Sequence, residues 1–198
     1  MLPQDFDLTM LFIKNIAKRY DSDRTHGEHV VKLALILFDE LRNLHGYHDD
    51  HRQLLEIAGL LHDIGWHGAT NGKHHKQSGK MIRELDIPGL DEKKRAMCAL
   101  IARYHTKSIP HEGRHRQFAS LDADEQDVVE WLAGILRIAD GLDCSHSKIV
   151  RTLNCRIKDK SIIIFLETGG ECSMEIRKAI MKQDLLQKKT GRGIIYKC

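Results

Sequence analysis

The chain has 198 residues, of which 41% are hydrophobic and 30% are charged, a composition typical of a soluble globular protein with one well-buried domain. Its net charge of +3 is too small to indicate nucleic acid as the main partner, and the sequence contains no recognisable basic and aromatic nucleic-acid motif. No apolar run approaches the ~20 residues that a membrane span needs. Neither a span nor a secretory leader is recognisable, so a cytoplasmic location is expected.

The cysteine and histidine content indicates which kinds of site the chain can form. The five cysteines are scattered, odd in number and never spaced as Cys-x-x-Cys, which favours reduced thiols over a disulfide framework or a thiolate zinc site. The thirteen histidines are the outlier in the composition, and they do not form a tag. Because imidazole is the commonest metal ligand in proteins, this content directs attention to metal binding.

The first two helices are predicted at residues 6–19 and 26–44. In the first of them, apolar residues recur at helical spacing from Leu8 and Leu11, which indicates an outer helix packed on the core through this face. The second carries one strong apolar stripe, made by Val30, Leu33, Leu37 and Leu41. His26 begins this stripe and is expected to point toward the core, whereas His29 lies one residue off it and is expected to do so less.

The sequence is organised around residues 60–65, where a His-Asp pair is set into an apolar run. His62 continues the apolar face of the preceding helix, and Asp63 comes at the helix end, where Gly65 is expected to adopt the left-handed cap conformation. A carboxylate at the negative end of the helix dipole needs a positive partner, and a divalent cation held by both side chains would supply it. The alternative is a hydrogen-bonded core histidine beside a solvated acid. A second His-Asp pair, at residues 48–49, lies in a polar connector and is interpreted as surface.

Three further helices are predicted at residues 75–86, 91–105 and 122–143. Each carries an ionisable residue on its apolar face. His75 begins the short first helix, His105 ends the apolar face of the second, and Asp140 stands in the third where a leucine is expected. The polar residues 106–121 are interpreted as a loop over the mouth of the site.

The hydrophobic period changes near residue 150, where alternating and β-branched residues replace helical spacing. The pattern predicts a hairpin at residues 152–158 and 161–166, a helix at 172–189 and a closing strand at 193–197. The sequence therefore predicts a mostly α protein, with a helical domain at residues 1–152 and a small C-terminal α+β unit at residues 153–198.

Ionisable residues on buried helix faces would each destabilise the fold if they were isolated. The set consists of His26, His62, Asp63, His75, His105 and Asp140. Gathered around one or two divalent cations they satisfy one another, because imidazole nitrogens and carboxylate oxygens suit Mn, Fe, Zn, Co or Mg. The alternative is a group of unrelated polar residues in the core.

The order His…His-Asp…Asp on helices resembles the HD superfamily of metal-dependent phosphohydrolases, which implies an HD-domain helical bundle. The resemblance implies a first metal held at four matching positions, His26, His62, Asp63 and Asp140. It further implies that Asp63 bridges to a second metal, for which His75 and His105 occupy the places of the additional ligands in binuclear members.

A narrower resemblance rests on residues 35–39, 74–78, 103–107 and 136–146. These stretches are similar to the C-terminal HD region of the exopolyphosphatase/guanosine pentaphosphate phosphohydrolase family, and the likeness covers roughly residues 20 to 198. The actin-like catalytic half of that family is absent from this sequence, so the substrate is not implied. A cyclic dinucleotide is disfavoured, because no Gly-Tyr-Pro follows His105 and because Trp66 stands where the cyclic-dinucleotide phosphodiesterases have lysine.

The expected function is that of a metal-dependent phosphohydrolase that cleaves a nucleotide or polyphosphate-type ester or anhydride through a metal-activated water. Asp63 and His105 are the predicted catalytic residues. The candidate contacts to substrate phosphate are Lys76, Arg103, Lys107 and Lys148. The alternative is a regulatory or dimerising module that binds a nucleotide, a polyphosphate or a partner chain without turnover. The ligand set favours the enzyme. A phosphorylated small molecule is the expected partner, no membrane or nucleic-acid partner is expected, and a homodimer is left open.

Overall fold

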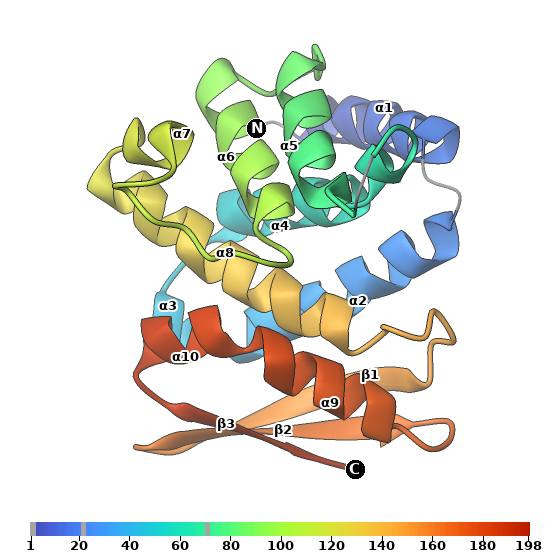
Figure 1. Ribbon diagram of the computed structural model, residues 1–198, viewed down its shortest axis with the longest axis vertical. Helices are drawn as coiled ribbons and strands as arrows, with labels where there is room; N and C mark the ends of the chain where they lie inside the picture. Colours follow the sequence, from blue (N-terminus) through green and yellow to red (C-terminus); the bar gives the residue numbers. More distant parts are fainter. Residues whose placement is uncertain (1–2, 21–22, 70–71) are drawn as a thin grey trace.

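The computed structural model describes residues 3–20, 23–69 and 72–198, and Figure 1 shows a body of helices above a small sheet. The helical body contains α1 (Pro3–Tyr20), α2 (Arg24–Glu40), α3 (Arg42–His45), α4 (Asp49–Leu60), the 3-10 turn η1 (Ile64–Trp66), α5 (His74–Glu84), α6 (Glu92–Arg103), α7 (Arg116–Ala119) and α8 (Ala123–Gly141). The C-terminal unit contains β1 (Val150–Ile157), β2 (Ser161–Thr168), α9 (Ser173–Lys182), α10 (Asp184–Thr190) and β3 (Gly193–Lys197). The predicted fold class, mostly α with a small C-terminal α+β unit, is confirmed.

Helix α8 is the central element of the fold. It begins with a capping box, in which the Asp122 side chain accepts from the Glu125 backbone N–H and the Glu125 side chain accepts in return. Val129, Leu132 and Leu136 are fully buried, and α8 packs against α2, α4 and α6 on the helical body and against α9 and α10 of the C-terminal unit. Residues near the end of α8 therefore face both parts of the molecule.

Helix α1 forms as predicted, but the face assigned to the core is wrong. Met10, Ile13 and Ala17 are buried, whereas Leu8 and Leu11 are 63% and 60% exposed. Apolar residues occur on both sides of this helix, so spacing alone could not tell which side would meet α4 and η1.

His29 also departs from the expectation. The residue is buried, and its Nε2 donates to the carbonyl of Val150 at 2.8 Å. Burial lowers the pKa of this imidazole, which favours the neutral ring. His29 thus connects α2 to the first residue of β1 and does not face the same space as His26.

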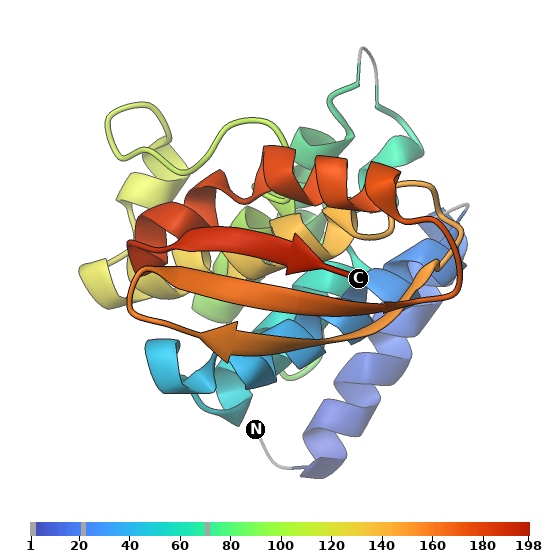
Figure 2. The same ribbon diagram turned by 90° about the horizontal axis from the view of Figure 1, so that it is seen from below.

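The three strands lie in the order β1-β2-β3. The predicted hairpin is confirmed: β1 and β2 are antiparallel with Leu153 opposite Leu166, and β3 runs parallel to β2 with Ile162 opposite Ile194. Figure 2 shows the sheet in front of α2, α8, α9 and α10, with its other face uncovered by the described helices. The single predicted helix is interrupted at Gln183, which separates α9 from α10.

Two of the cysteines differ from the expected reduced state. Cys172, just before α9, is joined by a disulfide to Cys198 at the end of β3, and their Cα atoms lie 7.9 Å apart. The remaining cysteines are free. Their scattered spacing could not indicate this pairing, because parallel β3 returns the chain end to the start of α9.

Within the described residues, no helix combines the length and the apolarity that crossing a membrane would require.

The C-terminal unit packs closely on α8 at a glycine. A Cβ added to Gly141 would lie 2.8 Å from both the Cα and the N of Ala179 in α9, and backbone atoms cannot move aside individually. We therefore expect Gly141→Ala to lower the free energy of unfolding by about 2–3 kcal/mol despite the better helix propensity of alanine. Gly170→Ala is the matched control, since no described atom lies within 4 Å of the added Cβ. Equal urea midpoints for the two variants would contradict this packing.

Candidate metal centre

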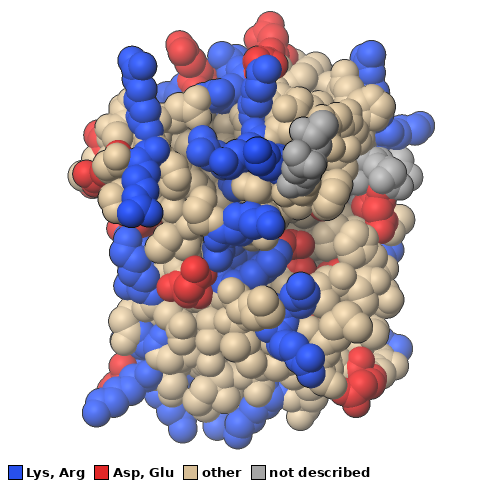
Figure 3. All heavy atoms as spheres, in the orientation of Figure 1, with Lys and Arg blue, Asp and Glu red and all other residues tan. Residues whose placement is uncertain are grey.

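A cavity of about 280 Å³ lies where α2, α8 and α9 meet the segment around η1 and the ends of α5 and α6. Side chains that can bind a cation or an anion line it, namely His26, Asp63, His74, His105, Asp140, Cys144, His146, Lys178 and Lys182. Figure 3 shows Lys and Arg side chains gathered over the middle of this face, with a small group of acidic atoms recessed among them. The cavity therefore joins buried carboxylates and imidazoles to a basic rim.

Two of the histidines are oriented by the same type of local hydrogen bond. The Nδ1 of His62 donates to the carbonyl of Gly59, and the Nδ1 of His105 donates to the carbonyl of Ala102, both at 2.6 Å. Each acceptor lies three residues earlier, at the end of α4 or α6. These bonds fix the tautomer, so that Nε2 carries the lone pair that a metal needs. The Nε2 of His62 is buried and has no hydrogen-bond partner among the residues that the structure describes.

His26 lies in the first turn of α2 between two carboxylates. Its Nδ1 is 2.8 Å from Asp143 Oδ2, and its Nε2 is 3.4 Å from Asp140 Oδ1. Burial lowers the pKa of the imidazole, but the hydrogen bonds to Asp140 and Asp143 outweigh burial and raise it to about 10. Binding of a metal at Nε2 therefore requires displacement of a proton, while Asp143 keeps the ring in place.

Asp63 is the carboxylate that the imidazoles surround. Its Oδ1 is 3.5 Å from His74 Nε2 and 3.6 Å from His105 Nε2, and its Oδ2 is 3.5 Å from His62 Nε2. Burial raises the pKa of this carboxyl, but the fields of His62 and His105 more than offset burial and lower it. The Oδ1 atom is buried and has no hydrogen-bond partner within the described part of the chain. A buried charged oxygen of this kind is what a bound cation would satisfy.

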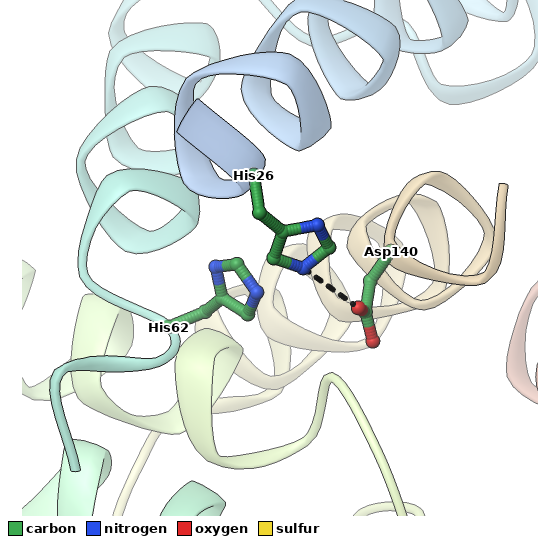
Figure 4. A group of neighbouring side chains, drawn as sticks. All are labelled: His26, His62 and Asp140. Atoms are coloured by element: carbon green, nitrogen blue, oxygen red, sulfur yellow. Dashed lines mark ion pairs between the residues drawn. The ribbon is translucent and has the colours of Figure 1, made fainter. Parts of the chain in front are cut away.

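The ligand atoms fall into two overlapping groups. His26, His62 and Asp140 form one, and His62, Asp63 and His105 form the other; within each, the ligand atoms lie within 4.8 Å of one another. Figure 4 shows the first group converging from α2, the end of α4 and α8, with the His26–Asp140 pair marked. All five residues are buried. The donor set of imidazole nitrogens and carboxylate oxygens fits one or two divalent cations.

The chain is similar to a known protein family over most of its length. The family of the Ppx/GppA phosphatase, domain III, matches residues 10–189, which is nearly the whole chain. The chain belongs to this family. The predicted resemblance to the C-terminal region of the exopolyphosphatase/guanosine pentaphosphate phosphohydrolase family is thereby confirmed. A phosphatase family agrees with a divalent metal and a phosphorylated substrate, and the match concerns one domain of such proteins.

In this domain III, His74 lines the cavity and its neighbour His75 does not. His74 Nε2 lies 3.2 Å from His105 Nε2, close to Asp63. His75 is buried, whereas His74 is partly exposed. Burial, and then the nearby positive groups, lower the pKa of His75 to about 4, and its Nδ1 has no hydrogen-bond partner among the described residues. The sequence places two histidines at the start of α5, and a helix turns by about 100° per residue, so spacing could not choose between them.

The cations at the cavity are not those selected from the sequence. Lys76 and Arg103 line a separate groove of about 80 Å³ between α5 and α6, and Lys107 and Lys148 are exposed away from the cavity lining. Lys178 and Lys182 of α9 face the cavity instead, and Lys182 Nζ contacts Asp140 Oδ2. These lysines come from the C-terminal unit, so only the packing of α9 on α8 could reveal them.

A buried arginine fixes the end of α9 beside the centre. Arg137 of α8 donates to the carbonyls of Tyr104 and Lys182, each at 3.0 Å, and to the carboxylate of Asp184 at 2.8 Å. One guanidinium thus connects the end of α6, the end of α9 and the start of α10. This arrangement holds the backbone of Lys182 in place relative to His105.

The connection after the His-Asp pair differs from the prediction. Helix α4 ends at Leu60, and Gly65 lies inside the 3-10 turn η1 rather than in a left-handed cap. A Cβ at Gly65 would lie 2.3 Å from the His74 carbonyl oxygen and 2.4 Å from the Ser78 backbone nitrogen. The glycine is therefore required for close approach to α5, which brings Asp63 to His74. The loop expected over the site reaches the cavity only at Thr106.

Proposed function

We propose that this domain is a metal-dependent phosphohydrolase that cleaves a nucleotide or polyphosphate-type phosphate ester or anhydride. The observation that carries the proposal is a pair of buried ligand atoms, His62 Nε2 and Asp63 Oδ1, that lack a hydrogen-bond partner among the described residues. They belong to one ligand group, and Asp63 lines a cavity that two lysines also line. Buried acids and imidazoles without cations would be destabilising, whereas their grouping suits metal-assisted hydrolysis.

The proposed roles follow from the contacts. A divalent cation in such a site supplies Lewis-acid polarisation of phosphate and lowers the pKa of water. The proposed ligands are His26, His62, Asp63, His105 and Asp140, with His74 in place of the predicted His75 as a further candidate. Asp143 keeps His26 oriented. Lys178 and Lys182 bind the phosphate oxygens of the substrate through charge-assisted hydrogen bonds.

This assignment makes the C-terminal unit part of the proposed active site. Residues 1–152 supply the ligands, and residues 153–198 supply Lys178 and Lys182. We accordingly propose two structural units that form one functional site. Strand β1 crosses the boundary between these two ranges, so the C-terminal unit of the structure begins at Val150, before the predicted boundary.

A regulatory or dimerising module without turnover is the second candidate. Two observations favour it: the family match concerns domain III alone, and Lys182 Nζ contacts Asp140 Oδ2. An amine at that oxygen is a built-in counter-ion for the carboxylate, and it would lessen the need for a metal at this side of the centre.

Hydrolysis assays separate the two candidates. Wild type, incubated with Mn, Fe, Zn, Co or Mg, is tested against nucleotides, cyclic nucleotides, guanosine tetraphosphate and short polyphosphates, with released phosphate as the readout. We expect turnover with at least one pair of metal and substrate. Lys178→Met and Lys182→Met should each lower kcat/KM about 10- to 100-fold, because a hydrogen bond to a charged group contributes roughly 1.5–3 kcal/mol.

Lys80→Met is the matched control, since this lysine lies on the exposed side of α5 with a 59% exposed side chain. Its kcat/KM should stay within about twofold of wild type. Absence of turnover throughout the screen, together with tight binding of a nucleotide or polyphosphate, would establish the regulatory module instead.

A further inference from the structure

Trp66 is an exposed aromatic residue in the wall of the metal centre. Its side chain is 52% exposed and lines the cavity, whereas the other tryptophan, Trp131, is 6% exposed in the core. Single apolar residues on a surface are ordinary. Trp66 differs because its indole stacks on His74, with ring centroids 4.1 Å apart and an interplanar angle of 15°. One face of the ring is fixed against the centre, and exposure leaves area for a flat ligand.

Hydrogen bonds hold the backbone that carries the indole. The backbone N–H of Trp66 donates to the carbonyl of Asp63 at 3.0 Å, and the N–H of Gly65 donates to Ser78 Oγ at 2.9 Å. The 3-10 turn therefore couples the position of the ring to the position of the carboxylate. A platform that is already ordered loses little conformational entropy when a ligand binds.

The path from the carboxylate to the indole is short. His74 contacts both: its Nε2 lies 3.5 Å from Asp63 Oδ1, and its ring face stacks on Trp66. A single imidazole ring and one stacking distance thus separate the centre from the aromatic platform. Trp66 and Asp63 line the same cavity, so one ligand there can contact both. Lys178 and Lys182 offer positive charge in the same cavity.

We propose that Trp66 is the stacking platform for a nucleobase, and that it makes this site select nucleoside phosphates over phosphates without a base. The proposal rests on the proposed function in that the phosphate lies at the metal centre. Every base has a π-face, and stacking on an aromatic side chain is tolerant of base identity. Selection therefore concerns the presence of a base, and Trp66 acts as a specificity-determining residue.

A matched pair of hydrolysis-resistant ligands tests the proposal by binding alone. α,β-Methylene-ADP and methylenediphosphonate share the phosphonate group, and only the first carries a nucleoside. We expect wild type, in the presence of Mn²⁺, to bind α,β-methylene-ADP more tightly in calorimetry. Trp66→Ala should weaken that binding about 5- to 150-fold, which is the range for loss of one base stack. The affinity of the variant for methylenediphosphonate should stay within about twofold of that of wild type. Trp66→Phe should retain most of the affinity.

Fluorescence gives an independent readout. Because Trp131 is buried, quenching by α,β-methylene-ADP should come from Trp66 and should disappear in Trp66→Phe. Met181→Ala serves as the control, since Met181 is 67% exposed on α9 and does not line the cavity. It should bind both ligands as wild type does.

Two outcomes would overturn the inference. Wild type that binds both ligands equally has no base platform. A Trp66→Ala variant that loses affinity equally for both, at an unchanged Tm, would show that Trp66 only positions His74. Neither measurement involves turnover, so a chain that binds the nucleotide through Trp66 but hydrolyses nothing refutes the proposed function and supports this inference. Hydrolysis of tripolyphosphate together with equal binding of the two ligands would support the proposed function and refute this inference.

Discussion

Gly65→Ala is expected to disrupt the metal centre, whereas Gly68→Ala, in the same connection, is expected to leave it intact. The Cβ of alanine at position 65 would lie 2.3 Å from the carbonyl oxygen of His74 and 2.4 Å from the backbone nitrogen of Ser78. Both atoms belong to the first turns of α5, so the clash is relieved only if η1 and α5 separate. The variant would also strain the hydrogen bond from the N–H of Gly65 to Ser78 Oγ.

The expected loss for Gly65→Ala is roughly 4 kcal/mol of unfolding free energy, at the upper end for a single substitution. No described residue lies within 4 Å of a Cβ added to Gly68, so that variant should stay within about 0.5 kcal/mol of wild type. Urea denaturation measures the difference, and elemental analysis of the folded protein measures the metal. A soluble Gly65→Ala protein with the urea midpoint and metal content of Gly68→Ala would contradict the close approach.

Helical periodicity predicted most of the fold and the burial of the central site residues. Asp140 interrupts the apolar stripe of α8, and His62 continues the apolar stripe of α4 just past the end of that helix. The burial of both followed from spacing alone, and both are buried. The hairpin followed equally well from alternation on either side of a short polar turn. Long periodic segments specify their buried side locally, which is why these features needed no tertiary information.

The parts that could not be predicted depend on contacts between elements. His74 rather than His75 faces Asp63 because η1 and α5 approach through Gly65, and a shift of one residue changes the direction of a helical side chain by about 100°. Lys182 reaches Asp140 because α9 packs on α8 through Gly141. Neither contact leaves a periodic trace in the sequence.

His62→Ala is expected to remove metal binding more completely than loss of any other single histidine. His62 belongs to both ligand groups, whereas His26 and His105 each belong to one. His26→Ala or His105→Ala should therefore retain the ligands of the other group, and His62→Ala should weaken both. If the proposed function holds, turnover of His62→Ala should fall by about 10³-fold or more, since loss of the cations removes several kcal/mol of transition-state stabilisation.

The decisive measurement is the rise in Tm when a divalent metal is added, together with the metal equivalents found by elemental analysis. A ligand that binds only the native state at about 100 times its Kd stabilises it by about 2.7 kcal/mol, so wild type should show a clear rise. The rise should vanish in His62→Ala and persist in part in His26→Ala and His105→Ala. Comparing rises rather than absolute Tm values removes the effect of the buried side chain on metal-free stability.

The second His-Asp pair provides the control. His48 and Asp49 are exposed, and the side chain of His48 makes no capping hydrogen bond to α4, so His48→Ala should bind metal as wild type does. The comparison tests position rather than residue type, because both variants lose the histidine of a His-Asp pair. If His62→Ala kept the metal equivalents and the Tm rise of His48→Ala, the buried His-Asp pair would not be the metal centre, and the orphaned nitrogen of His62 would need another partner.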